Sequence, residues 1–212
     1  MAEMKINKKL LILAVVLFAL FIVFTVLAAT YDRAPIGADG SAVGFSHLNN
    51  AFHQRFGYRS SFYKITQYLG YICLMLAAMN ATVACLDLVR TKSLKKMDRD
   101  YLVTMILYAV VVLLYIFFEK VVINVRPTEA EASYPSSHTM LALTVFYSQT
   151  VLLKKMQKKE KGTRIALSVI CYLAMVAMVV LRLFSGVHWL TDIYAAVLLS
   201  VSLLIGYRAF IK

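Results

Sequence analysis

Six long apolar runs separated by polar segments dominate the pattern along the chain. They lie at about residues 10–29, 65–87, 101–123, 139–153, 165–182 and 189–211, and the fourth is the shortest. A membrane-spanning helix needs roughly 20 predominantly apolar residues. The pattern therefore predicts an all-α, polytopic membrane protein with six transmembrane helices, formed by residues 1–212 as one domain.

The longest polar segment, at about residues 30–64, follows the first run. Its first half is rich in turn-forming glycine and proline. Its second half places apolar side chains at helical spacing among polar ones, at Phe45, Leu48, Phe52 and Phe56. This spacing predicts an amphipathic interfacial helix in the first outer loop. Two interpretations stay open, a helix that gates lipid entry and a cap over the bundle.

The second run contains small residues that permit close contact between helices, among them Gly70 and Ala77. Asn80 is the strongly polar residue near its middle, and we expect it to form a hydrogen bond to another helix. The first run follows lysines, as a signal peptide does. Its length and the lack of a small-residue cleavage site before Tyr31 favour a retained helix.

Composition and charge agree with a bilayer location. Hydrophobic residues make up 61% of the chain and charged residues only 16%, which is too apolar for a soluble globule of 212 residues. The net charge of +12 comes from basic residues that six spans would place on one side: Lys5, Lys8, Lys9, Arg90, Lys92, Lys95, Lys96, Arg99, Lys154, Lys155, Lys158, Lys159, Lys161, Arg164, Arg208 and Lys212. The positive-inside rule makes that side cytoplasmic, with both termini inside. Aromatic residues do not interleave with the second lysine cluster, so no nucleic-acid partner is expected.

Charged residues at the membrane boundary are costly and therefore usually functional. Arg182, His188 and Asp192 lie where the fifth run ends and the sixth begins. If the chain is helical from Trp189, His188 and Asp192 lie one turn apart on one face. The carboxylate then takes a proton from one imidazole nitrogen and leaves the other free to attack.

A second group lies upstream between the third and fourth runs. It comprises Arg126-Pro127 and the sequence Tyr134-Pro-Ser-Ser-His138, which leads into the fourth run. Guanidinium groups suit bidentate phosphate contacts. Ser136 and Ser137 fall where a helix begins, and its free amides favour an anion. Both groups end on the same face of the membrane, the outer one by the charge rule.

Together these motifs resemble the type 2 phosphatidic acid phosphatase family of membrane lipid phosphatases, which shares its site with vanadium haloperoxidases. The third motif matches fully, with arginine, five residues, histidine, three residues and aspartate. The second matches as Pro-Ser-Ser-His, where glycine commonly precedes the histidine. The first is partial, because Glu119 stands where the family has a lysine and Lys120 follows it.

The resemblance implies a role for each matching residue. His188 attacks phosphorus and forms a phosphohistidine, Asp192 orients His188, and His138 protonates the leaving alcohol and then activates water. Arg126, Arg182, Ser136, Ser137 and Lys120 are expected to bind phosphate, with Lys120 in place of the family lysine. The helix is expected to end before Arg126, since a residue before proline avoids helical geometry.

The sequence thus predicts a hydrolase for a lipid phosphate or diphosphate, with its active site on the outer face of the cell membrane. Phosphatidic acid, phosphatidylglycerol phosphate and isoprenyl diphosphates are the candidate substrates. No cofactor and no metal are expected, because arginines supply the positive charge and no carboxylate cluster of the magnesium kind is present. The alternatives are a lipid phosphotransferase with the same intermediate and a non-catalytic phospholipid-binding or transport protein. The oligomeric state stays open.

Overall fold

A computed structural model describes residues 6–155 and 160–211. Lys5, Lys158, Lys159 and Lys212, which belong to the basic segments, lie outside this range. The described residues form helices joined by short connections and one two-stranded hairpin: α1 (Lys8–Thr30), β1 (Ala34–Pro35), β2 (Ala42–Val43), α2 (Ser46–Phe56), α3 (Ser60–Thr91), α4 (Arg99–Lys120), α5 (Ser137–Leu152), the 3₁₀ turn η1 (Leu153–Lys155), α6 (Lys161–Phe184) and α7 (Leu190–Phe210).

The helical, membrane-spanning class predicted from the sequence is confirmed. Among the described residues, α1, α3, α4, α6 and α7 are each long and apolar enough to cross a bilayer. The predicted count of six spans is not confirmed in the same way, because α5 has 16 residues. At 1.5 Å per residue it covers about 24 Å, less than the roughly 30 Å of a bilayer core.

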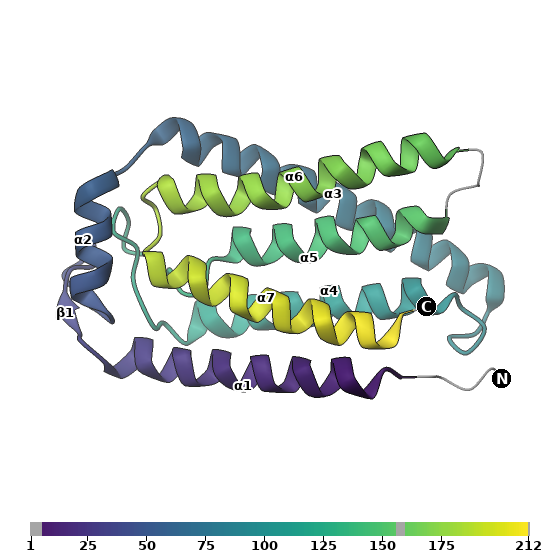
Figure 1. Ribbon diagram of the computed structural model, residues 1–212, viewed down its shortest axis with the longest axis horizontal. Helices are drawn as coiled ribbons and strands as arrows, with labels where there is room; N and C mark the ends of the chain where they lie inside the picture. The colour runs from purple at the N-terminus through teal and green to yellow at the C-terminus, as the bar shows by residue number, and fades with distance from the viewer. Residues whose placement is uncertain (1–5, 156–159, 212) are drawn as a thin grey trace.

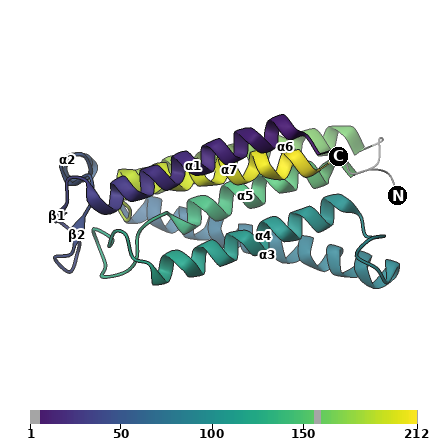
Figure 2. The ribbon, with the colours of Figure 1, turned by 90° about the horizontal axis from the view of Figure 1, so that it is seen from below.

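Helix α5 lies at the centre of the bundle. Figure 2 shows it between a layer of α3 and α4 and a layer that contains α1 and α7, and it contacts α3, α4, α6 and α7. Ten of its 16 residues are buried, so it is covered by protein instead of lipid. Its buried hydroxyls bond back to its own turns, as when Thr144 Oγ1 donates to the Met140 carbonyl at 2.7 Å.

Polar contacts tie the helices together inside the bundle. The Asn80 side-chain amide of α3 donates to the Tyr108 hydroxyl of α4 and to Gln149 Oε1 of α5, both at 3.0 Å. This confirms the predicted interhelical role of Asn80. No water is available inside the bilayer, so such bonds are what satisfies the polar atoms of a buried amide.

The segment between α1 and α3 crosses one end of the bundle (Figure 1). Here β1 and β2 form a short antiparallel hairpin, and α2 confirms the helix predicted in the first outer loop. Phe52 and Phe56 pack against Phe184 of α6, with ring centroids 6.0 and 4.8 Å apart. Asn49 is buried and bonds to Thr191 at the start of α7. The contacts are those of a cap on the bundle; the location of α2 in the membrane interface stays a prediction.

The basic segments gather at the opposite end. Figure 1 shows that the start of α1, the end of α7, the α3–α4 connection, the end of α5 and the start of α6 all lie at the end away from α2. Lys8, Lys92, Lys154 and Arg208 belong to these described segments. The two ends of the bundle therefore differ in charge as the sequence pattern predicts, and which end faces the cytoplasm stays a prediction.

Candidate active site

Two connections meet at the end of the bundle that α2 covers, one between α4 and α5 and the other between α6 and α7. The second makes a sharp turn at Gly186, whose φ is 73°. A Cβ at this position would lie 2.2 Å from the Gly57 carbonyl oxygen. Only glycine combines this left-handed conformation with such a close approach. The turn carries the chain from Arg182, at the end of α6, to His188 just before α7.

Asp192 is completely buried in the first turn of α7. One carboxylate oxygen, Oδ2, accepts hydrogen bonds from the Trp189 amide at 3.0 Å and from the Ser133 hydroxyl. The other, Oδ1, accepts from the Asn124 side-chain amide at 2.9 Å. A carboxylate at a helix N-terminus also interacts favourably with the helix dipole. Asp192 therefore has a fixed position before any substrate arrives.

The buried imidazole of His188 lies between Ser133 and Arg182. Its Nδ1 lies 2.9 Å from the Ser133 carbonyl oxygen and 3.2 Å from the Ser133 hydroxyl, and its Nε2 lies 3.2 Å from Arg182 Nη2. Arginine only donates hydrogen bonds, so Nε2 is the acceptor and the ring proton lies on Nδ1. The lone pair that a nucleophile needs is thus on Nε2, facing the guanidinium.

The expected direct proton contact between His188 and Asp192 is replaced by a route through Ser133. The two side chains lie 3.7 Å apart between Nδ1 and Oδ2, which is longer than a hydrogen bond. The Ser133 hydroxyl contacts both, donating to Asp192 and lying beside Nδ1. Sequence spacing put the histidine and the carboxylate on one face but did not reveal the serine between them.

Burial lowers the pKa of His188 to about 4, and the positive charges of Arg182 and Arg126 act in the same direction, while Asp192 partly opposes them. A neutral imidazole is the nucleophilic form. The surroundings therefore keep His188 ready to attack over the whole physiological pH range.

Arg182 is fully buried and lies between the two histidines. Nη1 donates to Thr66 Oγ1 at 3.1 Å, and Nη2 lies 3.4 Å from His138 Nδ1 as well as facing His188. Its Nε has no hydrogen-bond partner, and in the described part of the chain Arg182 forms no ion pair. A buried charge without a counter-charge is costly unless an anion completes the site.

His138 stands in the first turn of α5. Because Arg182 donates to its Nδ1, its ring proton lies on Nε2, which faces α3. Gly70 of α3 makes room for this ring, since a Cβ there would lie 2.9 Å from His138 Cδ2 and 3.3 Å from Nε2. Gly70, which the sequence predicts to permit close contact between helices, thus lies next to a residue of the candidate site.

The start of α5 also lies at the site. Ser136 is the residue before the helix; its amide donates to the Asp192 carbonyl and its hydroxyl accepts from Thr139. Within the described residues no side chain caps this helix end. No side chain therefore competes for the first-turn amides, including that of Ser137, and the binding of an anion by these amides stays a prediction.

Arg126 reaches the site less directly. Its Nη1 lies 3.3 Å from both Glu129 Oε2 and Glu131 Oε2. The arginine still lies close enough for its charge to lower the pKa of His188. Glu129 and Glu131 are therefore ion-pair partners of Arg126.

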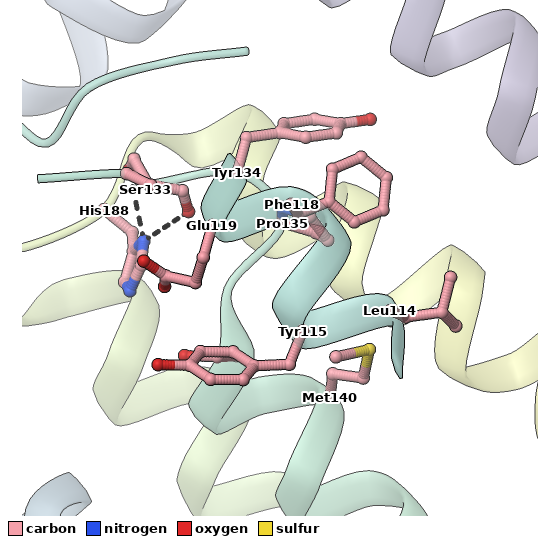
Figure 3. Close-up of a pocket in the computed structure, with 11 residues that line it drawn as sticks. Leu114, Tyr115, Phe118, Glu119, Ser133, Tyr134, Pro135, Met140 and His188 are labelled. Carbon is pink, nitrogen blue, oxygen red and sulfur yellow. Dashed lines mark hydrogen bonds between the residues drawn. The ribbon is translucent and has the colours of Figure 1, made fainter. Parts of the chain in front are cut away.

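Glu119 and Lys120 end α4 with their side chains in different places. A small cavity is lined by Glu119 together with Tyr115, Ser133, Ser137 and His188. Figure 3 shows the Glu119 carboxylate on the side of the cavity where His188 lies. Both side chains are exposed, but only Glu119 lines this cavity. Lys120, the residue expected at the phosphate, is therefore not a lining residue of the cavity.

Four further residues support the site, and sequence reasoning did not single them out for this role. Ser133 and Asn124 hold Asp192, and Thr66 holds Arg182. Asn124 also accepts from the Gly44 amide at 3.1 Å, next to the buried Asn49. Asn124 and Ser133 flank the arginine motif as polar residues near apolar runs, which is the one signal the sequence offers; Thr66 and Asn49 come from distant segments and leave none.

The chain resembles a known protein family and a solved structure. A family model for the PAP2 superfamily matches residues 104–212. A crystal structure of a transmembrane PAP2-type phosphatidylglycerolphosphate phosphatase from Bacillus subtilis has a similar fold, with a TM-score of 0.63, 17% sequence identity, and coverage of 92% of this chain and 93% of that chain. No curated protein sequence matches the chain.

The matched range includes every charged residue from Arg126 to Asp192 described above, and the resemblance noted in the sequence is confirmed. Since the family model covers more than half of the chain, this protein belongs to the PAP2 superfamily of membrane phosphatases.

Proposed function

We propose that this membrane phosphatase hydrolyses a lipid phosphate or diphosphate through a phosphohistidine on His188. The observation that carries the proposal is the fully buried guanidinium of Arg182, which faces both His188 and His138 and has no carboxylate partner among the described residues. A phosphoryl group placed there would neutralise the buried charge and touch both rings. Charge that gathers on its equatorial oxygens during transfer would be stabilised by the same cation.

The steps follow from the hydrogen bonds. His188 Nε2 attacks phosphorus, the bond to the leaving oxygen breaks, and that oxygen takes a proton from His138 on the opposite side of Arg182. His138 acts here in its doubly protonated form, with the second proton on Nδ1 once the phosphate anion replaces Nδ1 as the partner of Arg182. Water then loses a proton to His138 and attacks phosphorus, which releases inorganic phosphate and restores neutral His188. During the first step Nδ1 acquires partial positive charge, and Ser133 and Asp192 stabilise it.

A cavity beside His138 supports a lipid substrate. It has a volume of about 340 Å³ and is lined mainly by apolar side chains of α3, α4 and α5, including Leu74, Val111 and Leu141. Ser137 and His138 form its polar end. A phosphate at Arg182 could thus carry an acyl or isoprenyl chain into the cavity and onward to the bilayer. Phosphatidic acid, phosphatidylglycerol phosphate and isoprenyl diphosphates all fit this division into polar and apolar parts.

The proposed reaction takes place at the outer face and without a metal. The basic segments lie at the other end of the bundle, and basic segments favour the cytoplasmic side. Arg182 and Arg126 supply positive charge at the site. Within the described ranges, no three His, Cys, Asp or Glu side chains gather as a metal-binding group. The positions of the two arginines support the proposal that they do the work of a divalent cation.

The test uses the full chain in detergent with EDTA and a panel of lipid phosphates, with release of free phosphate as the readout. Wild type should release phosphate, and His188→Ala should release none while keeping the same melting temperature. Substrate carrying labelled phosphate, quenched in acid, should leave the label on His188. Transfer to another lipid without release would indicate a phosphotransferase, and neither release nor transfer a binding protein. Activity lost with EDTA and restored by a divalent metal would refute the metal-free route.

A further inference from the structure

A second cavity lies at the basic end of the bundle, away from the candidate active site. It has a volume of about 600 Å³ and lies between the ends of α5, α6 and α7. Three cations line it: Lys154 in η1, Arg164 in the first turn of α6 and Arg208 in the last turn of α7. Seventeen residues of nearly continuous helix separate Ser137 from Lys154, or about 25 Å at 1.5 Å per residue.

Among the described residues, no acidic side chain lines the cavity to balance these charges. In the described part of the chain, none of the three cations has a carboxylate within 4 Å. The neighbouring Lys155 shows the contrast, because its Nζ lies 2.7 Å from Asp98 and 3.1 Å from Asp100. Three like charges that share one cavity repel one another, so an anion that binds between them gains from all three.

The remaining lining residues indicate what the anion is attached to. Ile165, Val169 and Tyr172 lie along α6 below the cations, and each is about half exposed. Since α6 is a membrane-spanning helix, these side chains meet acyl chains. The cavity is therefore basic at the membrane boundary and apolar toward the bilayer interior. A free phosphate would use only the first part, whereas a lipid would use both.

We infer that this cavity binds the headgroup of an anionic phospholipid from the leaflet at the basic end of the bundle. The phosphate lies among Lys154, Arg164 and Arg208, and the acyl chains follow the exposed face of α6. Basic pockets between transmembrane helices are a recognised form of site for anionic headgroups. The inference does not depend on the reaction proposed above.

Binding there would join the far ends of the three helices that carry the catalytic groups. His138 begins α5, Arg182 ends α6, and Asp192 begins α7. A ligand that binds the folded bundle and not the unfolded chain raises its stability. The anionic lipid should therefore raise the melting temperature of the protein and hold these helices in register.

The experiment compares two triple variants in neutral detergent, titrated with dioleoylphosphatidylglycerol or dioleoylphosphatidylcholine. Phosphatidylglycerol is a phosphodiester, so it is not a substrate for a monoester phosphatase. Lys154→Gln/Arg164→Gln/Arg208→Gln empties the cavity of charge. The control, Lys92→Gln/Lys95→Gln/Lys96→Gln, removes the same charge from the α3–α4 connection at the same end.

Wild type and control should be stabilised by phosphatidylglycerol far more than by phosphatidylcholine, and the cavity variant should need at least tenfold more phosphatidylglycerol for the same shift. If both triple variants lost the same amount of stabilisation by phosphatidylglycerol, the effect would come from overall charge, and the site would be refuted. An equal shift with inorganic phosphate would refute a lipid source, and no preference by wild type would refute anion binding. If the triple variant does not fold, Arg164→Gln alone should need at least threefold more lipid, and an unchanged requirement would count against the site.

Discussion

Ser133 connects the two residues that the sequence placed on one face of a helix. Its hydroxyl donates to Asp192 and lies beside His188 Nδ1, while its carbonyl oxygen accepts the Nδ1 proton at 2.9 Å. The backbone carbonyl alone is enough to fix the tautomer, because a backbone atom remains whatever the side chain is. The hydroxyl instead transmits the negative charge of Asp192 to the ring.

This division of roles predicts different costs for two substitutions. Ser133→Ala keeps the carbonyl contact, so we expect kcat to fall by roughly 10-fold, in the range typical of residues that support a ligand or nucleophile. Asp192→Asn removes the charge and disturbs three hydrogen bonds, and we expect a loss of more than 10³-fold. Steady-state kinetics on one lipid phosphate measures both. Equal losses would mean that Asp192 acts only through the serine hydroxyl.

The lowered pKa of His188 predicts how the protein responds to acid. Its value of about 4 lies below the roughly 6.5 of a histidine in an unfolded chain. Between these values the unfolded chain binds more protons, so the contribution of His188 to stability is present above about pH 6.5 and is lost as pH falls toward 4. Phosphohistidine formation should likewise persist to about pH 5 in a rapid acid-quench assay, provided that the substrate stays ionised. An acid limb at 6.5 in both measurements would show that His188 titrates normally.

The end of α4 predicts an unequal effect of two neighbouring substitutions. A carboxylate about 5 Å from a phosphate charge costs roughly 3 kcal/mol at an effective dielectric of 20, and Glu119 lines the cavity with His188 while Lys120 does not. We therefore expect Glu119→Gln to raise kcat/KM by at least tenfold, because it removes this repulsion, and Lys120→Ala to change kcat/KM by less than twofold. Full kinetics of both variants decides the matter. A tenfold loss for Lys120→Ala, with Glu119→Gln unaffected, would restore the lysine to the phosphate.

At the scale of elements, α3 positions His138 because it has no side chain at Gly70. Gly70 lies in the middle of a long helix, where glycine costs about 1 kcal/mol relative to alanine. The cost is tolerated because the His138 ring occupies the space of the missing side chain. Helix α5 is surrounded by other helices, so it does not need a lipid-facing surface. This explains why α5 can be short and rich in hydroxyl groups.

Gly70→Ala should accordingly displace His138 and lower kcat by at least tenfold, with little loss of stability. The matched control is Gly162→Ala in α6, because a Cβ there meets nothing within 4 Å. Gly162→Ala should leave kcat unchanged and stabilise the helix slightly. Activity and melting temperature of the two variants are the readouts. If Gly70→Ala kept full activity, the position of His138 would not depend on α3.

At the scale of the whole molecule, the two ends of the bundle differ in charge. The site, α2 and the hairpin lie at one end, and the basic segments and the second cavity lie at the other. The membrane potential and anionic lipids both favour basic segments on the cytoplasmic side. The proposed outward-facing site follows from this asymmetry.

Cysteine labelling in intact cells tests the orientation. Ser41 is a poor probe because its hydroxyl is buried, whereas Ala38 in the same loop is exposed. In a background where the exposed Cys85 is alanine, Ala38→Cys should react with a membrane-impermeant thiol reagent, and Lys95→Cys should react only after the cells are opened. Labelling of Lys95→Cys alone in intact cells would put the active site in the cytoplasm.

The amino-acid sequence alone was enough to predict the helical membrane class and the family, which are confirmed, and it proposed the main site residues. Apolar runs of membrane length leave few alternatives to helices, because every backbone polar group in lipid must bond within its own segment. The motif spacing then placed Arg182, His188 and Asp192 together, since residues near one helix start are local neighbours. The order of the spans predicted that His138 lies near these residues, because it brings both motifs to the same face of the membrane.

Only the tertiary structure decided how these residues contact one another. Ser133, Thr66 and Gly70 come from three separate segments, and no local period encodes which of their atoms meet Asp192, Arg182 and His138. The same is true of Glu119, because a residue near a helix end points into or out of a site according to how its helix is rotated in the bundle. Helix rotation is set by packing over the whole interface, and packing depends on contacts between residues that are distant in sequence.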